Sequence, residues 1–393
     1  MEYRRFGKTN KNISVITLGG MRFKHGWNKP RNEIAADTQE QCNHMVDLAL
    51  KSGINHIETA YGYIKSETAY GRALNDELKI DRSSYYLMTK GHPETAEKTR
   101  ETVEEQLKTL KTDYFDFYGW HGINNKEIFL SACKTGGPVE ELLKMKEEGI
   151  IKHVGFSTHA PLQVIKDTIN TNLFEFVNLH YYYFFQRNAP AVKLAEDKDM
   201  GVFIISPNDK GGQLFKAPEK VKNAIPYATP IQWNARFCLS HPGIHTLSFG
   251  MTEPAHVEEM KGIFPTHIPF SEKDMQSKLI LDEMVKDDPY AQFDAWQLDD
   301  DPSDLDLPIL LHWRKLWKCY DMIDFAKYRY DTLKDQNHWL PGAFATPEEI
   351  EKIDFTKVPG ELPLKELLTE LHEALYQPKV KQFDFSSVKI DKS

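Results

Sequence analysis

The chain alternates short runs of β-forming residues with amphipathic helical segments from its N-terminus to about residue 265. Eight runs are expected as strands, at residues 14–18, 55–59, 85–89, 115–119, 152–156, 176–180, 201–206 and 245–249. Between them apolar residues recur at helical spacing, as in Val103, Leu107 and Leu110. Hairpin turns of the Asn-Gly type are scarce between the runs, which is typical of parallel strands connected through helices.

Eight strands with intervening helices favour a (β/α)8 barrel. The alternative is an open doubly wound sheet, in which a GxGxxG fingerprint would follow the first strand. The sequence Gly19-Gly20-Met21-Arg22 stands there instead. We therefore predict an α/β chain with a (β/α)8 TIM barrel over residues 1–265 and a helical C-terminal extension over residues 266–393.

Composition excludes several classes of protein. The chain has 393 residues, 40% of them hydrophobic, and a net charge of −9 that is spread along the sequence. A large core is therefore expected, and neither nucleic acid nor an anionic membrane is expected as the main partner. No run approaches the length of a membrane-spanning helix, and the first ten residues lack the apolar region of a signal peptide.

The four cysteines, Cys42, Cys133, Cys238 and Cys319, are far apart and form no CxxC pair. Neither disulfides nor thiolate metal sites are expected from this spacing. A reducing cytoplasm is the compartment that fits such cysteine usage.

Four residues suited to proton transfer stand where predicted strands end. Glu58 ends the second strand, Tyr63 follows in its loop, Lys90 follows the third strand and His121 follows the fourth. The C-terminal ends of the strands meet at one mouth of a barrel, and barrel enzymes carry their active sites there. Each residue alone is more often a packing or solvated side chain, but four suitable types at successive strand ends weaken that interpretation.

Together these groups could protonate a carbonyl oxygen while hydride arrives at carbon. A free phenol has a pKa of about 10, and a nearby ammonium lowers it. Lys90 is expected to act in this way on Tyr63, with Glu58 holding Lys90 through a salt bridge. His121 is expected to orient the carbonyl oxygen or share the proton.

The sequence resembles the aldo-keto reductases over about residues 1–265. The family's Thr-Ala-x-x-Tyr motif appears in Glu58–Tyr63, its lysine in LMTKGH and its histidine in GWHGIN. The resemblance implies that Tyr63 is the general acid/base, Lys90 its tuner, Glu58 the acidic partner and His121 the orienting group. Tyr61 is a rival phenol without the family spacing. Glu58 replaces the family's Asp, and the extra methylene moves the carboxylate by roughly 1.5 Å.

The resemblance also implies a nicotinamide cofactor, with NADP(H) favoured over NAD(H) as a family property. The cofactor-binding residues expected from the matching stretches are Gly20, Met21, Ser157, Thr158, Asn178, Ser206, Pro207, Lys210, Gly211, Gly212, Gly250, Met251, Thr252 and His256. Thr158 replaces an Asn of the family, and Asn178 stands where the family often has Gln. The Lys-Ser pair and the Arg that grip a 2′-phosphate in NADP-preferring relatives are missing, so dual coenzyme use also fits.

A small-molecule carbonyl or alcohol is the expected substrate. Its pocket walls are expected from Trp27, Trp120, His159, Tyr181 and Tyr182, although aromatic residues near a barrel mouth are as often plain packing.

Residues 266–393 resemble the C-terminal region of a family branch that carries a ferredoxin-like iron–sulphur module. The matching phrases are LDLPILLHWRKL, AKYRYDTL and LPLKELLTELHEAL. No cysteine lies beyond Cys319, and thiolates are required for such clusters, so we expect the helical scaffold without a cluster. Helices are expected after Ser271, after Thr346 and over 364–375. The extension is expected to roof the active site or to form a contact between copies of a homo-oligomer.

Three functions remain open from the sequence. The first is an NAD(P)(H)-dependent oxidoreductase that interconverts an aldehyde or ketone and an alcohol. The second is a nicotinamide-binding regulatory subunit with little turnover. The third is a metal-dependent barrel hydrolase that uses His121, His159 and His180, but the first strand has no HxH pair, and we expect no metal.

Overall fold

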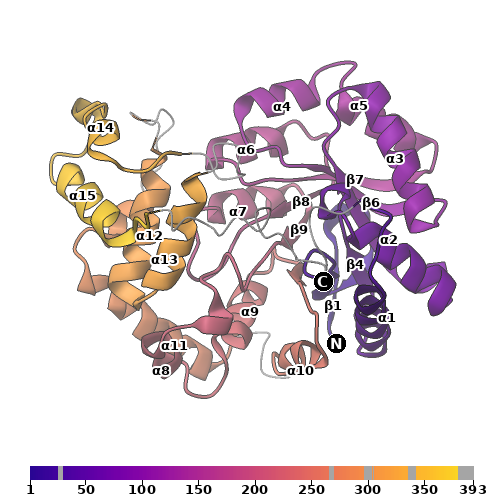
Figure 1. Ribbon diagram of the computed structural model, residues 1–393, viewed down its shortest axis with the longest axis horizontal. Coiled ribbons are helices and arrows are strands. Elements are labelled where there is room, and N and C mark those ends of the chain that lie inside the picture. The colour runs from indigo at the N-terminus through magenta and orange to yellow at the C-terminus, as the bar shows by residue number, and fades with distance from the viewer. Residues whose placement is uncertain (25–29, 265–269, 296–302, 304, 335–341, 379–393) are drawn as a thin grey trace, which may run out of the picture. The chain divides into compact units, whose positions relative to one another are not determined.

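The computed structural model describes residues 1–24, 30–264, 270–295, 303, 305–334 and 342–378 (Figure 1). The chain forms two compact units, residues 1–282 and 283–393, and each is described by itself. The domain division expected after residue 265 stays a prediction. All residues of α11 (Glu272–Glu283) except the last belong to the first unit.

The first unit is a closed barrel of eight parallel strands. The strands are β3 (Ile16–Gly19), β4 (His56–Glu58), β5 (Tyr86–Gly91), β6 (Phe115–His121), β7 (Ile151–Ser157), β8 (Phe176–Leu179), β9 (Gly201–Ile204) and β10 (Thr246–Phe249). Neighbours pair in chain order and β10 returns to pair with β3, which closes the sheet. The (β/α)8 barrel is therefore confirmed, and the open doubly wound sheet is excluded.

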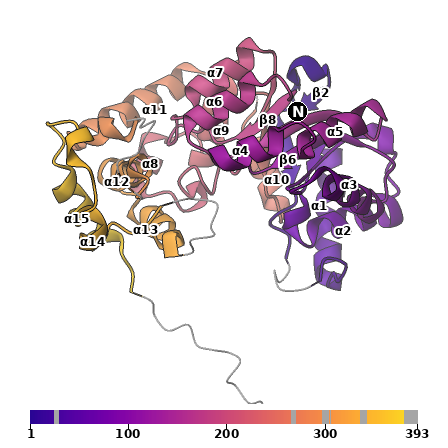
Figure 2. The same cartoon turned by 90° about the horizontal axis from the view of Figure 1, so that it is seen from above.

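Helices surround the strands, as Figures 1 and 2 show for α1, α2 and α3. The helices are α1 (Ala36–Lys51), α2 (Ser66–Gly71), α3 (Ala96–Leu110), α4 (Lys126–Cys133), α5 (Pro138–Glu147), α6 (Leu162–Asn170), α7 (Ala189–Asp197), α8 (Glu219–Ala224), α9 (Pro230–Ser240), α10 (Pro254–Lys261) and α11. Val103 and Leu110 are buried on α3, as their spacing predicts. Within the described ranges, no helix is long and apolar enough to cross a membrane.

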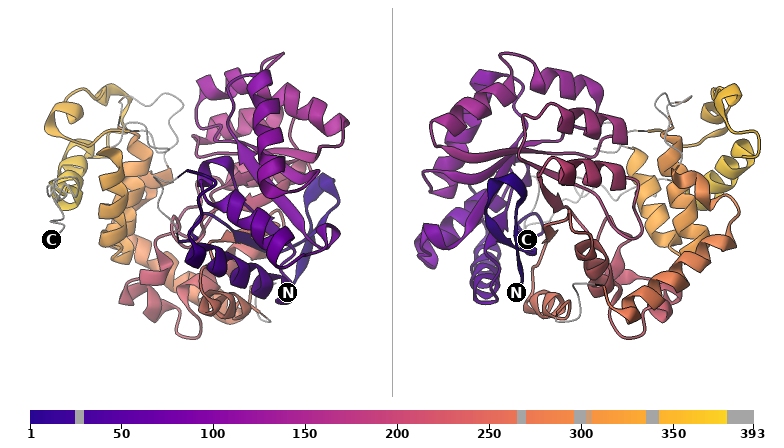
Figure 3. Two further views of the ribbon diagram at one scale, coloured as in Figure 1. Left: turned by 45° about the vertical axis from the view of Figure 1, so that its right-hand side comes forward. Right: turned by 180° about the vertical axis from the view of Figure 1, so that it is seen from behind.

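A short antiparallel hairpin precedes the barrel and was not expected from the sequence. Its strands are β1 (Tyr3–Arg5) and β2 (Asn12–Ser14), which can be followed by their indigo colour in Figure 3. Phe6 in its loop is fully buried, and its ring lies edge-on to Phe117, 5.2 Å away. The Lys8 N–H donates to the carbonyl of Asp199, just before β9 begins. The hairpin therefore closes the N-terminal end of the barrel.

The opposite end of the barrel carries the residues singled out by the sequence. Glu58 and His121 are the last residues of β4 and β6, and Lys90 is the last but one of β5. Tyr63 ends a 3₁₀ turn, Tyr61–Tyr63, in the loop after β4. The fold thus brings residues from three neighbouring strands to one mouth.

The second unit is helical. Its helices are α12 (Leu307–Tyr320), α13 (Ile323–Asp331), α14 (Pro347–Ile350) and α15 (Leu364–Leu375). One apolar face of α15 is buried, and the Thr346 side chain caps α14 by accepting from the Glu349 N–H. The helical extension is confirmed, whereas its resemblance to a ferredoxin-like module stays a prediction.

Candidate active site

One carboxylate oxygen of Glu58 is in contact with both Tyr63 and Lys90. Glu58 Oε1 accepts the Tyr63 hydroxyl at 3.2 Å and is also paired with the Lys90 ammonium. Lys90 Nζ donates a second bond to the carbonyl of Thr59 at 2.7 Å and lies 5.0 Å from the centre of the Tyr63 ring. Glu58 and Lys90 are both buried. The Tyr63 phenol and the Lys90 ammonium are therefore connected by the Glu58 carboxylate, to which both are bonded.

His121 lies beside this group. Its ring packs edge-on to the Tyr63 ring with centroids 6.0 Å apart, and it also lies 6.2 Å from the His92 ring. Burial lowers the pKa of His121 well below its usual value, and the positive charge of Lys90 adds to this effect. The imidazole is therefore neutral at neutral pH and can direct a hydrogen bond at a carbonyl oxygen without carrying a charge.

The pKa of Tyr63 departs from the sequence-based expectation in direction. Burial raises this pKa well above the ordinary value, and the Glu58 carboxylate adds to the rise through its charge and by accepting the phenol's hydrogen bond. In the ligand-free protein the Lys90 ammonium is paired with this carboxylate, and the net shift of the phenol pKa is upward; the role of Lys90 as tuner during the reaction stays a prediction. Without ligands, Tyr63 is therefore held as a neutral phenol.

The barrel accommodates glutamate at position 58 by leaving room for its second oxygen. Ser248 on β10 donates its hydroxyl to Glu58 Oε2 at 3.3 Å. Gly19, the last residue of β3, faces the same place: a Cβ there would lie 3.2 Å from Oε2 and 2.7 Å from the Ser248 hydroxyl. The carboxylate is thus bonded by Lys90 of β5, by Ser248 of β10 and by Tyr63 in the loop after β4, and the glycine at position 19 leaves space beside it.

Three polar residues expected to hold nicotinamide lie at the ends of β7 and β8. They differ in whether their side-chain oxygens already have hydrogen-bond partners in the protein. Ser157 Oγ accepts the Gly122 N–H at 3.1 Å, and the Thr158 hydroxyl donates to the Ile123 carbonyl at 2.6 Å. Asn178 is fully buried, and its Oδ1 has no hydrogen-bond partner among the described residues. An unpaired buried acceptor is costly, so Asn178 is the residue of the three best suited to bind an amide donor.

The loop after β9, where a phosphate-binding turn is predicted, has a tightly folded backbone. Gly211 is required there, because a Cβ would lie 2.1 Å from the carbonyl of Pro207. Ser206 adopts a positive φ of 50°, and its carbonyl accepts the Lys210 N–H at 3.1 Å. Gly212 also has a positive φ, 113°. The backbone is therefore folded back on itself at the strand end, where it can approach a ligand closely.

In the stretch after β10, two of the residues expected to bind the cofactor are already engaged within the protein. Met251 is buried, and the Thr252 N–H donates to His256 Nδ1 at 3.1 Å, so that ring nitrogen is engaged within the loop. A Cβ on Gly250 would lie 2.6 Å from the Arg22 side chain, which also pairs with Asp209 at 2.7 Å.

Arg22 is thus a cation at the predicted adenine end that sequence reasoning missed. It directly follows Gly20 and Met21, which stand at the end of the first barrel strand. The contact with Gly250 depends on the pairing of β3 with β10, the last strand of the barrel, and only that closure brings them together. Gly20 is buried and Met21 is exposed.

The predicted pocket walls stay a prediction, and the structure shows the following neighbours for them. The His159 and His180 rings stack with centroids 4.7 Å apart, and Tyr182 is hydrogen-bonded to His180 and to the Ile205 carbonyl. Tyr181 instead stacks on Phe237 of α9 at 5.9 Å. Trp120 is buried with its indole N–H unpaired among the described residues. Trp27 lies outside the described residues.

The three histidines proposed for a metal-dependent hydrolase separate into two groups. His159 and His180 lie together, with ring nitrogens 2.5 Å apart, whereas the ring neighbours of His121 are Tyr63 and His92. Across the described part of the chain, no three His, Cys, Asp or Glu side chains are grouped so as to hold a metal ion. The geometry therefore gives the hydrolase alternative no support.

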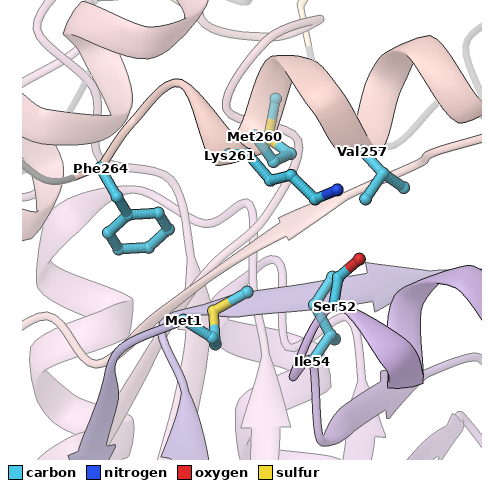
Figure 4. A pocket seen from close by; sticks show the side chains of 7 residues that line it. All are labelled: Met1, Ser52, Ile54, Val257, Met260, Lys261 and Phe264. Atoms are coloured by element: carbon cyan, nitrogen blue, oxygen red, sulfur yellow. The ribbon is translucent and has the colours of Figure 1, made fainter.

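A pocket of about 220 Å³ lies elsewhere, lined by Met1, Ser52, Ile54, Val257, Met260, Lys261 and Phe264 (Figure 4). Ile54 precedes β4, whereas Glu58 ends it, so the pocket is at the other end of that strand. Its walls contain none of the predicted site residues.

Fold and geometry together define the class: a (β/α)8 barrel with an acid, a phenol, an ammonium and an imidazole at its C-terminal mouth. A model of the aldo/keto reductase family matches residues 15–278. The chain belongs to the aldo/keto reductase family and is an oxidoreductase.

Individual relatives are distant. L-galactose dehydrogenase of Arabidopsis thaliana is 25% identical over 240 residues, which cover 58% of this chain and 71% of that protein. A methylglyoxal reductase of Escherichia coli (strain K12) is 27% identical over 147 residues, or 36% of this chain and half of that protein. The holo form of an aldo-keto reductase from Bacillus halodurans superposes with a TM-score of 0.59 at 19% identity, covering 71% of this chain and 96% of that one. The structural likeness supports the fold.

Proposed function

We propose that the protein interconverts an aldehyde or ketone and the corresponding alcohol with a nicotinamide cofactor, and that Tyr63 is the general acid/base. The observation that carries the proposal is the Glu58 oxygen shared by the Tyr63 hydroxyl and the Lys90 ammonium, with His121 packed beside the phenol. The four catalytic roles expected from the sequence are kept as part of this proposal.

The cofactor, when bound, supplies or accepts the hydride at the carbonyl carbon. During reduction, His121 orients the carbonyl oxygen, and Tyr63 turns its hydroxyl from Glu58 to that oxygen and donates its proton. The phenolate that remains is stabilised by the Lys90 ammonium, which Glu58 and the Thr59 carbonyl hold in place. In the oxidation direction Tyr63 takes the proton back.

Among the residues expected to hold the cofactor, Asn178 offers a specific interaction with a nicotinamide group. The unpaired Asn178 Oδ1 is an acceptor for a carboxamide N–H. We further propose that NADP(H) is preferred over NAD(H), with Arg22 contributing positive charge beside Gly250. The loop residues Ser206, Pro207 and Gly211 would approach the pyrophosphate through their backbone.

The proposal is tested by titrating the protein with NADPH and NADH while following tryptophan fluorescence, and then assaying NADPH oxidation with a panel of aldehydes and ketones. The panel includes methylglyoxal and sugars, because the similar proteins include a methylglyoxal reductase and two sugar dehydrogenases. Turnover of any carbonyl supports the proposal. Tight NADPH binding without turnover across the panel would instead favour the regulatory subunit, and no binding of either coenzyme would contradict both.

Replacing Asn178 with leucine is expected to change cofactor affinity and stability in opposite directions. NADPH binding should weaken by about tenfold, the effect of losing one hydrogen bond of about 1.4 kcal/mol. The ligand-free protein should become more stable, because an unsatisfied buried acceptor is removed at similar side-chain volume. Fluorescence titration and thermal unfolding measure the two effects, and unchanged NADPH affinity would remove Asn178 from the cofactor site.

Carbonyl reduction is expected to persist to alkaline pH. The reaction needs a protonated phenol, and the pKa of Tyr63 is raised by burial and by Glu58, so kcat/KM should show no alkaline decline below about pH 10. The profile is measured with NADPH and an aldehyde from the panel. Recovery of full activity on return to pH 7 controls for unfolding, and a reversible decline well below pH 10 would contradict the assigned pKa direction.

We propose the cytoplasm as the compartment. All four cysteines are free thiols, and thiols persist unpaired in a reducing environment. Contact between copies through the helical extension also stays a proposal, which sedimentation of the full chain would test.

A further inference from the structure

Arg31 makes three contacts around the turn that carries Tyr63. Its guanidinium carbon lies 3.5 Å from the centre of the Tyr61 ring, and Tyr61 is the first residue of that turn. The guanidinium also donates to Glu105 on α3, at 2.8 Å, and to Glu67 on α2. The Tyr61 hydroxyl donates to the same Glu105 carboxylate at 3.3 Å. Arg31, Tyr61 and Glu105 therefore form a closed ring of contacts.

The second carboxylate connects Arg31 to the strand of the catalytic lysine. Glu67 is buried, and its Oε1 accepts from the Thr89 hydroxyl at 2.6 Å and from Gln106 Nε2 at 2.5 Å. Gln106 Nε2 donates in turn to the backbone carbonyl of Lys90 at 3.2 Å. A continuous set of hydrogen bonds thus runs from Arg31 to β5.

The turn itself has an unfavourable backbone. Ile64, the residue after Tyr63, has a φ of 54°, and this left-handed region is strongly disfavoured for a β-branched side chain. Such a conformation persists only where the surrounding contacts fix it. Within the turn, the Tyr63 N–H donates to the Ala60 carbonyl at 3.0 Å, and Arg31 packs on the turn through Tyr61.

We propose that Arg31 is a positioning residue that holds the Tyr61–Tyr63 turn against β5 and so sets the Tyr63 hydroxyl relative to Glu58 and Lys90. The inference rests on the proposed function, in which Tyr63 transfers the proton. Arginine suits this place because a planar guanidinium can stack on a ring while its edge binds two carboxylates. Lysine offers a point charge and cannot make both contacts.

The test compares Arg31→Gln and Arg31→Lys with the unaltered protein in NADPH-dependent reduction of 4-nitrobenzaldehyde. We expect kcat to fall by about ten- to a hundredfold, because a misplaced catalytic group costs that much, while NADPH affinity stays unchanged. Arg31→Lys should recover only part of kcat. Tyr61→Phe keeps the stacked ring and should lose little, whereas Tyr61→Leu should resemble Arg31→Gln.

A second measurement does not depend on activity. Backbone hydrogen exchange of residues 60–66 should be faster in Arg31→Gln than in the unaltered chain, since the turn loses its outside contact. Arg100→Gln is the matched control: Arg100 on α3 also binds two carboxylates, Glu141 and Glu148, each at 2.7 Å, but these lie on or beside α5. This control should change neither kcat nor exchange in residues 60–66.

The outcomes separate this inference from the proposed function. Unchanged kcat and unchanged exchange in Arg31→Gln, with Tyr63→Phe inactive, would overturn the role of Arg31 and leave the function standing. A loss of NADPH binding in step with kcat would also overturn it, because that pattern indicates general damage. Full turnover in Tyr63→Phe would overturn the proposed function itself.

Discussion

Replacing Tyr63 with phenylalanine is expected to lower kcat for carbonyl reduction by about 10²- to 10⁴-fold, the usual contribution of a positioned acid. The substitution removes one oxygen and leaves the ring, so the contact with His121 and the packing above Lys90 are retained. The Glu58–Lys90 pair also remains, because it does not depend on the phenol. NADPH affinity should therefore stay the same, and stopped-flow or steady-state NADPH oxidation measures the loss.

Tyr61→Phe is the matched control for this result. Tyr61 stands two residues earlier in the same turn, but its hydroxyl bonds Glu105 rather than Glu58. It should keep most of the turnover. If Tyr61→Phe were inactive and Tyr63→Phe active, the phenols would have to exchange roles; if both were fully active, neither would be the acid.

Breaking the buried ion pair is expected to have the largest effect on stability. Glu58 and Lys90 are 3% and 1% exposed, so removing either charge leaves the other buried and unpaired. Glu58→Gln or Lys90→Met alone should lower the free energy of unfolding by about 3–5 kcal/mol. The double variant, Glu58→Gln with Lys90→Met, should recover most of this loss, since no isolated charge remains. Urea unfolding followed by far-UV circular dichroism measures all three.

The exposed pair of Arg5 and Asp199 provides the comparison. More than half of the Arg5 and Asp199 side chains is accessible to water, and such pairs contribute little. Arg5→Gln should leave the unfolding midpoint nearly unchanged. A double variant as unstable as the single ones would contradict the claim that the cost arises from an unpaired buried charge.

Local patterns were sufficient for the barrel and insufficient for the hairpin before it. Each barrel strand is a run of β-forming residues followed by an amphipathic helix, and both signals lie within a few residues of sequence. The strands β1 and β2 have three residues each, which is too short to show alternation. They are held by contacts remote in sequence, such as that of Phe6 with Phe117 more than 100 residues away.

The sequence alone determined the barrel and the identity of four residues at its mouth, because strand ends and motif residues are properties of short segments. Only the tertiary structure decided how those residues act on one another. It buried the Tyr63 phenol and put the Glu58 carboxylate against its hydroxyl, so the pKa of Tyr63 rises where the sequence had suggested a fall. It also brought Arg22 to Gly250 and Arg31 to Tyr61. Electrostatic and stacking energies depend on distances of a few ångströms between segments remote in the chain, and the order of residues does not contain those distances until the barrel closes.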